Sequence, residues 1–126
     1  MYSCTKSYTA HSSLTKYQVV QVRTDGKIES CASATSSSAL GIVQRSVSAG
    51  EMVDVVINGY TRALIGSNYT VGTDTRLLMA GTGAKLNKAQ STGNIPIAEI
   101  VTQESSLSYV DGDEIEILFG MKSPLA

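Results

Sequence analysis

Short apolar runs, most of them rich in β-branched residues, recur along the chain and are separated by turns that contain glycine. Charged and apolar side chains alternate with a period of two in residues 114–119, which is typical of a strand with one side facing solvent. Similar strand-like runs occupy residues 17–22, 28–31, 39–43, 52–57, 60–65, 75–80, 84–89 and 96–101. No long stretch carries an apolar stripe of helical period, so the pattern predicts an all-β chain.

Two dipeptides between these runs are strong hairpin signals. Asp25-Gly26 follows the run at 17–22, and Asn58-Gly59 follows the run at 52–57. Because glycine adopts positive φ without steric cost, both dipeptides suit the tight turns that join paired strands. The sequence therefore predicts one hairpin at each position.

The order of runs and turns is repeated. Residues 19–22, 28, 40–43 and 50–56 correspond to residues 77–80, 86, 97–100 and 112–118, at a separation of about 57 to 62 residues. We expect an internal repeat of approximately 16–66 and 72–120, although β-proteins with regular turns also resemble themselves by chance. One half has too few strands to bury both faces of a sheet. The expected fold is a compact β-barrel or β-sandwich, built from two similar halves that share one core.

The first 15 residues are polar and weakly patterned. We expect residues 1–15 to form an extended N-terminal arm, with at most one short strand near Tyr8. Residues 16–126 are expected to form a single β domain, since 126 residues fit one domain and leave little room for a second.

Charge and hydropathy exclude some classes of partner. The formal net charge is −1, which gives no reason to expect binding to nucleic acid. Six Lys and Arg stand against four Asp and Glu in residues 1–66, and four stand against seven in residues 67–126. No apolar run reaches the length of a membrane span, and the N-terminus lacks the apolar stretch of a signal peptide. We therefore expect no membrane partner, and synthesis in a cytosol.

The two cysteines, Cys4 and Cys31, leave two alternatives open. Cysteines in a reducing compartment are usually free thiols, so both could be small buried residues. A disulfide between them would instead pin the N-terminal arm to the domain.

Few residues suggest catalysis or metal binding. His11 is the sole histidine and has no Cys, Asp or Glu cluster nearby, whereas a metal site needs three or four converging ligands. The densest acidic cluster comprises Asp111, Asp113, Glu114 and Glu116. It could hold calcium, but its spacing does not match an EF-hand, and the two glutamates suit the solvent face of a strand.

The remaining motifs are weak. Residues 81–83, Gly-Thr-Gly, lack the lysine and the following helix of a phosphate loop. Residues 68–70, Asn-Tyr-Thr, fit a glycosylation acceptor only in a secreted protein. The six tyrosines are scattered without a basic patch. We predict no catalytic, cofactor-binding or metal-binding residue and no cofactor, and we expect that the chain is not an enzyme.

The arrangement of these runs and turns resembles that of the small head decoration, or capsid cement, proteins of tailed bacteriophages. The resemblance covers roughly residues 15–120 and is carried by residues 19–28, 40–43, 48–55, 71–74 and 112–118. It implies a compact β-barrel or β-sandwich that binds the outer surface of the capsid and stabilises it. It further implies the major capsid protein as partner, a homotrimer at threefold sites, and a location in the virion after assembly in the host cytoplasm.

Two other classes of function stay open. A receptor- or carbohydrate-binding β-domain of a viral fibre or surface protein would need an aromatic platform, and the aromatic residues are few. A head-associated lysin would need a cleft with paired carboxylates, for which Asp113 and Glu114 are the candidates.

Overall fold

The computed structural model describes residues 3–32, 39–101 and 107–120, and almost all of its regular structure is β. The elements are β1 Ser3–Thr9, β2 Val19–Val22, β3 Ile28–Ser30, β4 Ala39–Val43, β5 Met52–Leu64, β6 Tyr69–Thr70, β7 Leu77–Ala80, the 3₁₀ segment η1 Thr82–Ala84, β8 Leu86–Lys88, β9 Ala98–Ile100, β10 Ser108–Tyr109 and β11 Glu114–Phe119. No helix among the described residues is long and apolar enough to cross a membrane.

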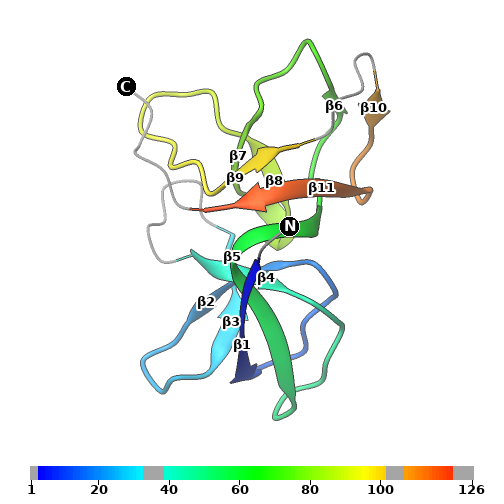
Figure 1. Cartoon of the computed structure of the whole chain (residues 1–126). Helices are drawn as coiled ribbons and strands as arrows, with labels where there is room; N and C mark the ends of the chain where they lie inside the picture. The colour runs from blue at the N-terminus through cyan, green and yellow to red at the C-terminus, as the bar shows by residue number, and fades with distance from the viewer. Residues whose placement is uncertain (1–2, 33–38, 102–106, 121–126) are drawn as a thin grey trace.

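Nine of the strands form one curled sheet. Its order is β3-β2-β4-β5-β11-β9-β7-β8, and β1 also pairs with β5, while β6 and β10 form a separate pair. Figure 1 shows strands β1 to β4 in the lower part of the molecule and strands β7 to β11 in the upper part, with β5 connecting the two. The all-β fold with two similar halves is therefore confirmed.

The sheet order is symmetric: β3, β2, β4 and β5, read from one edge, correspond to β8, β7, β9 and β11, read from the other edge. The pairing registers of corresponding strands also agree residue by residue. In the first hairpin Val20 pairs with Ser30, and in the second Leu78 pairs with Lys88. These are the residues that the sequence repeat matches to one another. The backbone pairing therefore shows that the β2–β3 hairpin and the β7–β8 hairpin are equivalent.

The match extends to the strands at the centre of the sheet. Ile42 of β4 pairs with Val56 of β5, and Glu99 of β9 pairs with Leu118 of β11. β4 therefore corresponds to β9, and the first part of β5 corresponds to β11. The small β6–β10 pair also has an equivalent, the antiparallel bridge between residues 14 and 47.

The segment expected to be an arm is a strand of the sheet. β1 pairs with β5 from Ser3 to Thr9, and the Ala10 and Leu14 side chains that follow are only 0% and 4% exposed. The short strand expected near Tyr8 is confirmed, but it belongs to the main sheet and does not extend away from it as an arm. Polar side chains on an edge strand hide such backbone pairing from sequence patterns. β1 corresponds to the second part of β5, so the equivalent halves are residues 3–57 and 58–119, hereafter the first and second halves.

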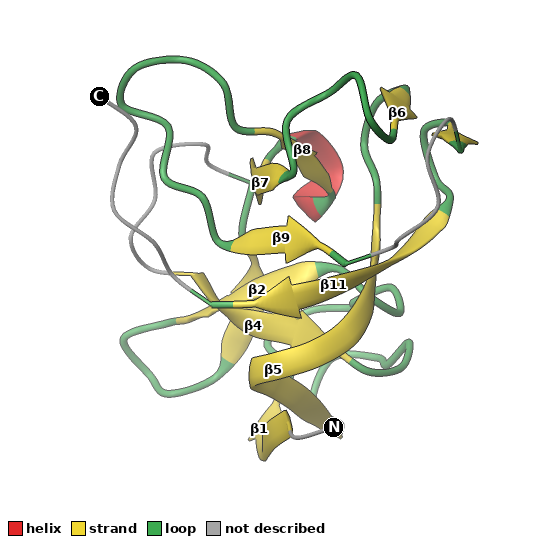
Figure 2. Cartoon of the chain, turned by 45° about the horizontal axis from the view of Figure 1, so that its top comes forward, coloured by secondary structure: helices red, strands yellow, loops and turns green. Residues whose placement is uncertain are grey.

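The hairpin predicted at Asn58-Gly59 is also wrong. β5 runs through both residues as one strand of 13 residues, and Gly59 has a φ of 111°. Figure 2 shows β5 as one long curved strand that leaves the lower strands and continues beside β11. A hairpin requires its two flanks to pair with each other, whereas the flanks of Gly59 pair with different strands, β1 and β4 before it and β11 after it.

The described residues form two hydrophobic clusters, not the one shared core that the sequence suggests. The smaller cluster lies in the first half and contains Ala10, Leu14, Val20, Ile28, Val43, Val47, Val53 and Val55. The larger cluster lies mainly in the second half, but Val19, Cys31 and Ile42 of the first half belong to it. In each half a parallel bridge, Ala10 to Ile28 or Ile65 to Leu86, brings the sheet back on itself and encloses the cluster.

Candidate functional site

The candidate site is an open groove where the two halves meet, which we call the junction groove. It has a volume of about 580 Å³ and is lined by Gln44, Tyr60, Thr61, Arg62, Val101, Glu116 and Ile117. Gln44 and Val101 directly follow β4 and β9, and the other lining residues belong to the second part of β5 and the middle of β11. The groove exists because β4 ends beside β5 while β5 continues into the second half.

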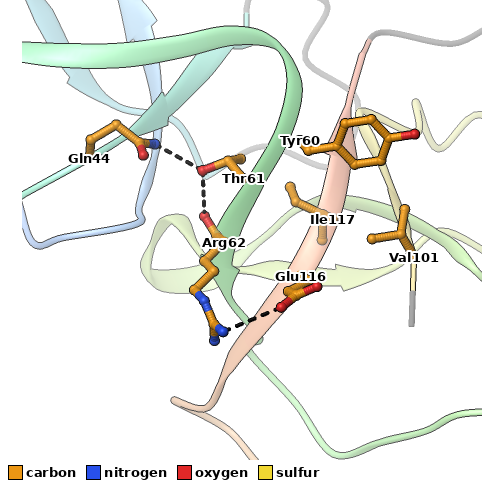
Figure 3. Close-up of a pocket in the computed structure, with 7 residues that line it drawn as sticks. All are labelled: Gln44, Tyr60, Thr61, Arg62, Val101, Glu116 and Ile117. Carbon is orange, nitrogen blue, oxygen red and sulfur yellow. Dashed lines mark hydrogen bonds and ion pairs between the residues drawn. The ribbon is translucent and has the colours of Figure 1, made fainter. Parts of the chain in front are cut away.

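Polar groups on one side of the groove are held by hydrogen bonds (Figure 3). The Gln44 Nε2 group donates to the Thr61 hydroxyl at 3.0 Å and to the Ile42 carbonyl at 2.9 Å. The Thr61 hydroxyl in turn donates to the Arg62 carbonyl at 3.2 Å. This network fixes the amide of Gln44 at the rim of the groove.

An ion pair crosses from β5 to β11 in the groove. The guanidinium Nη2 of Arg62 lies 3.3 Å from the Glu116 carboxylate, and the two side chains are 49% and 63% exposed. Such an exposed pair contributes only about 0 to 1 kcal/mol to stability. Both groups therefore remain available to a partner at little cost to the fold.

The other side of the groove is apolar. Tyr60 and Val101 lie beside Ile117 in Figure 3, and the Tyr60 side chain is 40% exposed whereas Ile117 is fully buried. An exposed aromatic ring with a carboxylate, a guanidinium and an amide nearby can make apolar and hydrogen-bonded contacts with a protein or a saccharide. The groove holds one hydroxyl, that of Thr61, and one carboxylate, that of Glu116, among the lining residues that the structure describes.

The structure places His11 away from this groove. His11 follows β1, and its backbone N–H donates to the Ile28 carbonyl at 2.9 Å. No group of three or more His, Cys, Asp or Glu side chains in the described residues could hold a metal ion.

The acidic cluster of the sequence does not converge on one point. Asp111 pairs with Lys85 at 2.9 Å, and the Asp113 carboxylate accepts the Val110 N–H at 2.9 Å within the turn. Glu116 faces Arg62, while the exposed Glu114 begins β11. Each carboxylate thus has a local role in a turn or on a strand face, and a shared calcium site is not formed.

Both cysteines are free thiols. Cys4 lies half-buried in β1, and Cys31 is buried in the larger cluster. Of the two alternatives, the structure has unbonded thiols.

The other sequence motifs have structural roles. Gly81-Thr82-Gly83 forms the turn between β7 and β8, so a strand follows it and not a helix. In the segment Asn68–Thr70, Tyr69 is 1% exposed and its hydroxyl donates to the Thr75 carbonyl at 2.6 Å. Burial raises the pKa of the Tyr69 hydroxyl, which keeps it protonated as a donor.

Sequence reasoning missed the junction groove. Gln44 and Val101 occupy equivalent positions directly after β4 and β9, because their N–H groups donate to the equivalent carbonyls of Asp54 and Glu116. The repeat could have paired them. Gln44 and Arg62 line the same groove only because β5 continues through residues 58 and 59, where the sequence predicted a turn.

Comparisons with known proteins give matches among solved structures. Neither a protein-family model nor a curated protein matches the sequence. Among solved structures, the chain is similar to the head fiber gp8.5 N base of bacteriophage phi29, with a TM-score of 0.69 and 14% sequence identity. The similarity covers 94% of this chain and 95% of that one, so the two proteins share the fold over nearly all of both chains.

Proposed function

We propose that the chain is a structural protein of a bacteriophage virion that binds the outer surface of the head and stabilises it. The observation that supports this most strongly is the shared fold with the base of a phage head fiber over nearly the whole of both chains. The proposed partner is the major capsid protein, and the proposed assembly is a homotrimer at threefold sites.

The physical properties of the chain suit this role. A protein that binds only the assembled shell stabilises it by mass action, without any chemical step. Three linked copies engage the shell together, so individually weak contacts add up to firm attachment. The junction groove, with exposed charges of both signs and one exposed aromatic ring, is a surface suited to such contacts.

Binding to heads tests the proposal directly. Purified protein is mixed with expanded heads that lack it, and co-sedimentation is measured against protein concentration. We expect saturable binding and a higher temperature of genome release from the loaded heads. Absence of co-sedimentation at concentrations well above those of the virion components would refute the proposal.

The second candidate, a receptor- or carbohydrate-binding domain, is favoured by one observation, the exposed Tyr60 ring in the junction groove. Tyr60→Ala should abolish saccharide binding if this candidate is correct. Binding is measured on a glycan array and by calorimetry, with Val110→Ala as the control, since Val110 is an exposed apolar residue outside the groove. Head binding retained together with a blank glycan array supports the capsid role.

A further inference from the structure

Equivalent positions in the two halves are buried to different extents. Three apolar residues at one end of the second half are almost fully buried, with exposures of 2%, 1% and 2% for Ala80, Ile97 and Phe119. We call them the covered surface. They lie at the end of β7, just before β9 and at the end of β11, and all three belong to the larger cluster.

Their equivalents in the first half are not covered. The strand registers match Val22, Leu40 and Ile57 to those three residues, and we call them the uncovered surface. Val22 is 43% exposed, and Leu40 and Ile57 are only partly buried against the smaller cluster. The same architecture therefore leaves an apolar surface on the first half that the second half keeps from water.

The covered surface shares its cluster with a face of the first half. Val19 and Ile42, from β2 and β4, belong to the larger cluster, although their neighbours Val20 and Val43 belong to the smaller one. The contact continues at its edge, where the Gln18 Nε2 group donates to the carbonyl of Gly83 in the β7–β8 turn at 3.0 Å. The first half thus supplies the outer face of β2 and β4 to the second half.

The second half has an equivalent outer face. Leu77 of β7 and Glu99 of β9 occupy the positions of Val19 and Ile42, and both side chains are half-buried. Leu77 is the apolar residue of this pair, whereas Glu99 has a carboxylate where the first half has Ile42. The Leu77 side chain is therefore the part of this face that would pack against the uncovered apolar surface.

The edge of the contact is complementary in charge. Backbone hydrogen bonds match Gln18 to Arg76 and Gly83 to Asp25. A contact that repeats the internal one between two copies would therefore bring Arg76 of one copy near Asp25 of the other. In the single chain the Asp25 carboxylate lies 3.4 Å from the Arg23 guanidinium, and Arg76 Nη1 donates to the Ile100 carbonyl at 3.1 Å, so the new contact would add to these interactions. The first half, residues 3–57, carries five basic against four acidic residues, and the second half, residues 58–119, carries four against seven. The first half of one copy and the second half of another therefore have net charges of opposite sign, which favours their association.

We propose that the uncovered surface of one copy binds the outer face of the second half of another copy, centred on Leu77. The contact is head-to-tail, because it joins two different surfaces. Contacts of this type can close into a ring, which is compatible with a trimer. The inference deepens the proposed homotrimer and rests on that part of the proposed function, and its own support is the unequal burial of equivalent residues.

Two single variants and their mixture test the contact. Val22→Lys places a charge on the uncovered surface of the first half, and Leu77→Lys places a charge on the outer face of the second half. We expect the wild type to be oligomeric and each variant to be a monomer when mass is measured by multi-angle light scattering. Val110→Lys is the matched control, because Val110 is 57% exposed but lies outside both surfaces, and it should keep the wild-type mass.

Mixing the two variants distinguishes a head-to-tail contact from a symmetric one. The Val22→Lys chain retains an intact Leu77 face, and the Leu77→Lys chain retains an intact Val22 surface, so an equimolar mixture should give a complex of two chains and no larger species. Circular dichroism spectra like that of the wild type show that both variants fold.

Three outcomes overturn the inference: a monomeric wild type, variants that keep the wild-type mass, or a mixture that stays monomeric. Failure of the wild-type oligomer to bind heads, with these masses as expected, would overturn the capsid role alone.

Discussion

The β2–β3 and β7–β8 hairpins each contain a turn residue with a left-handed backbone conformation, but the residue differs. Gly26 has a φ of 85°, and Ala84 at the equivalent position has a φ of 59°. A Cβ at Gly26 would meet nothing within 4 Å, so the conformation alone favours glycine there. Ala84 is fully buried, so the packing of its methyl group opposes the strain of its backbone.

Exchanging these residues tests the balance between strain and packing. Gly26→Ala should lower the free energy of unfolding by about 1 kcal/mol, because an L-residue resists positive φ. Ala84→Gly should change it by less than about 1 kcal/mol, since relief of strain offsets the lost methyl burial. Urea denaturation measures both changes. Equal losses in the two variants would show that backbone strain does not control stability at these turns.

Asp74 makes stability depend on pH. Its carboxylate accepts the Thr70 N–H at 2.8 Å and lies 3.4 Å from the Lys88 ammonium, and these contacts hold the pKa of Asp74 below its ordinary value. A carboxyl with a lowered folded-state pKa contributes stability above the unfolded-state pKa and loses it as pH falls toward the folded-state value. That contribution is present at neutral pH and decreases once the pH drops to about the ordinary value of 3.8.

Two variants separate the causes. Asp74→Asn should be less stable than the wild type at pH 7, with the difference shrinking as the pH is lowered through this range. Lys88→Gln should retain most of the pH dependence, because the backbone hydrogen bond from Thr70 is the larger cause of the shift. Free energies of unfolding from urea titrations across pH measure both effects. If Lys88→Gln reduced the pH dependence of the free energy of unfolding as much as Asp74→Asn does, the ion pair with Lys88 would be the main cause of the lowered pKa of Asp74.

At the scale of elements, β5 determines the architecture. Its first part completes the first half by pairing with β1 and β4, and its second part begins the second half by pairing with β11. Gly59, with a φ of 111°, lies where one set of partners ends and the next begins. A single strand thus replaces the connection that two separate domains would need.

The pairing of β1 predicts its hydrogen exchange. In the isolated protein, the amides that β1 directs toward β5 should exchange at rates close to those of the central strands, because they are bonded along the whole strand. The Ala10 amide, which donates to the Glu51 carbonyl at 2.8 Å, is a marker for this pairing. If the β1 amides exchanged at the rate of an unstructured peptide, β1 would not be paired with β5 in solution and residues 1–15 would form the arm that the sequence suggested. NMR detects either outcome residue by residue.

At the scale of the whole molecule, the two halves are joined by more than the chain. β5 belongs to both, and Val19, Cys31 and Ile42 of the first half are buried in the larger cluster. Unfolding the first half alone would expose these side chains and part of the second half's core. We therefore expect the halves to unfold together.

Equivalent core substitutions test this cooperativity. Val20→Ala and Leu78→Ala remove fully buried side chains at matched positions, one in each cluster. Each should cost about 1 to 4 kcal/mol, and calorimetry should show one transition that moves down in temperature for both variants. Separate transitions, with only one moved by each variant, would mean that the halves are independent domains.

The sequence by itself determined most of the strands that carry apolar residues, and it determined their repeat. Glu114–Phe119 and the Asp25-Gly26 hairpin follow from period-two alternation and from the positive φ that glycine permits, and both are local properties. The four matched strands were evident for the same reason, because each half repeats its local pattern.

Only the tertiary structure decided which strands pair across the halves. Ser3–Thr9 carries polar side chains, so its membership in the sheet depends on backbone bonds to β5 and left no apolar pattern. Asn58-Gly59 has the local chemistry of a turn, but its flanks find different partners, and pairing between distant strands outweighs a local turn preference. The junction groove and the uncovered surface both follow from that non-local pairing, which explains why residue patterns alone did not reveal them.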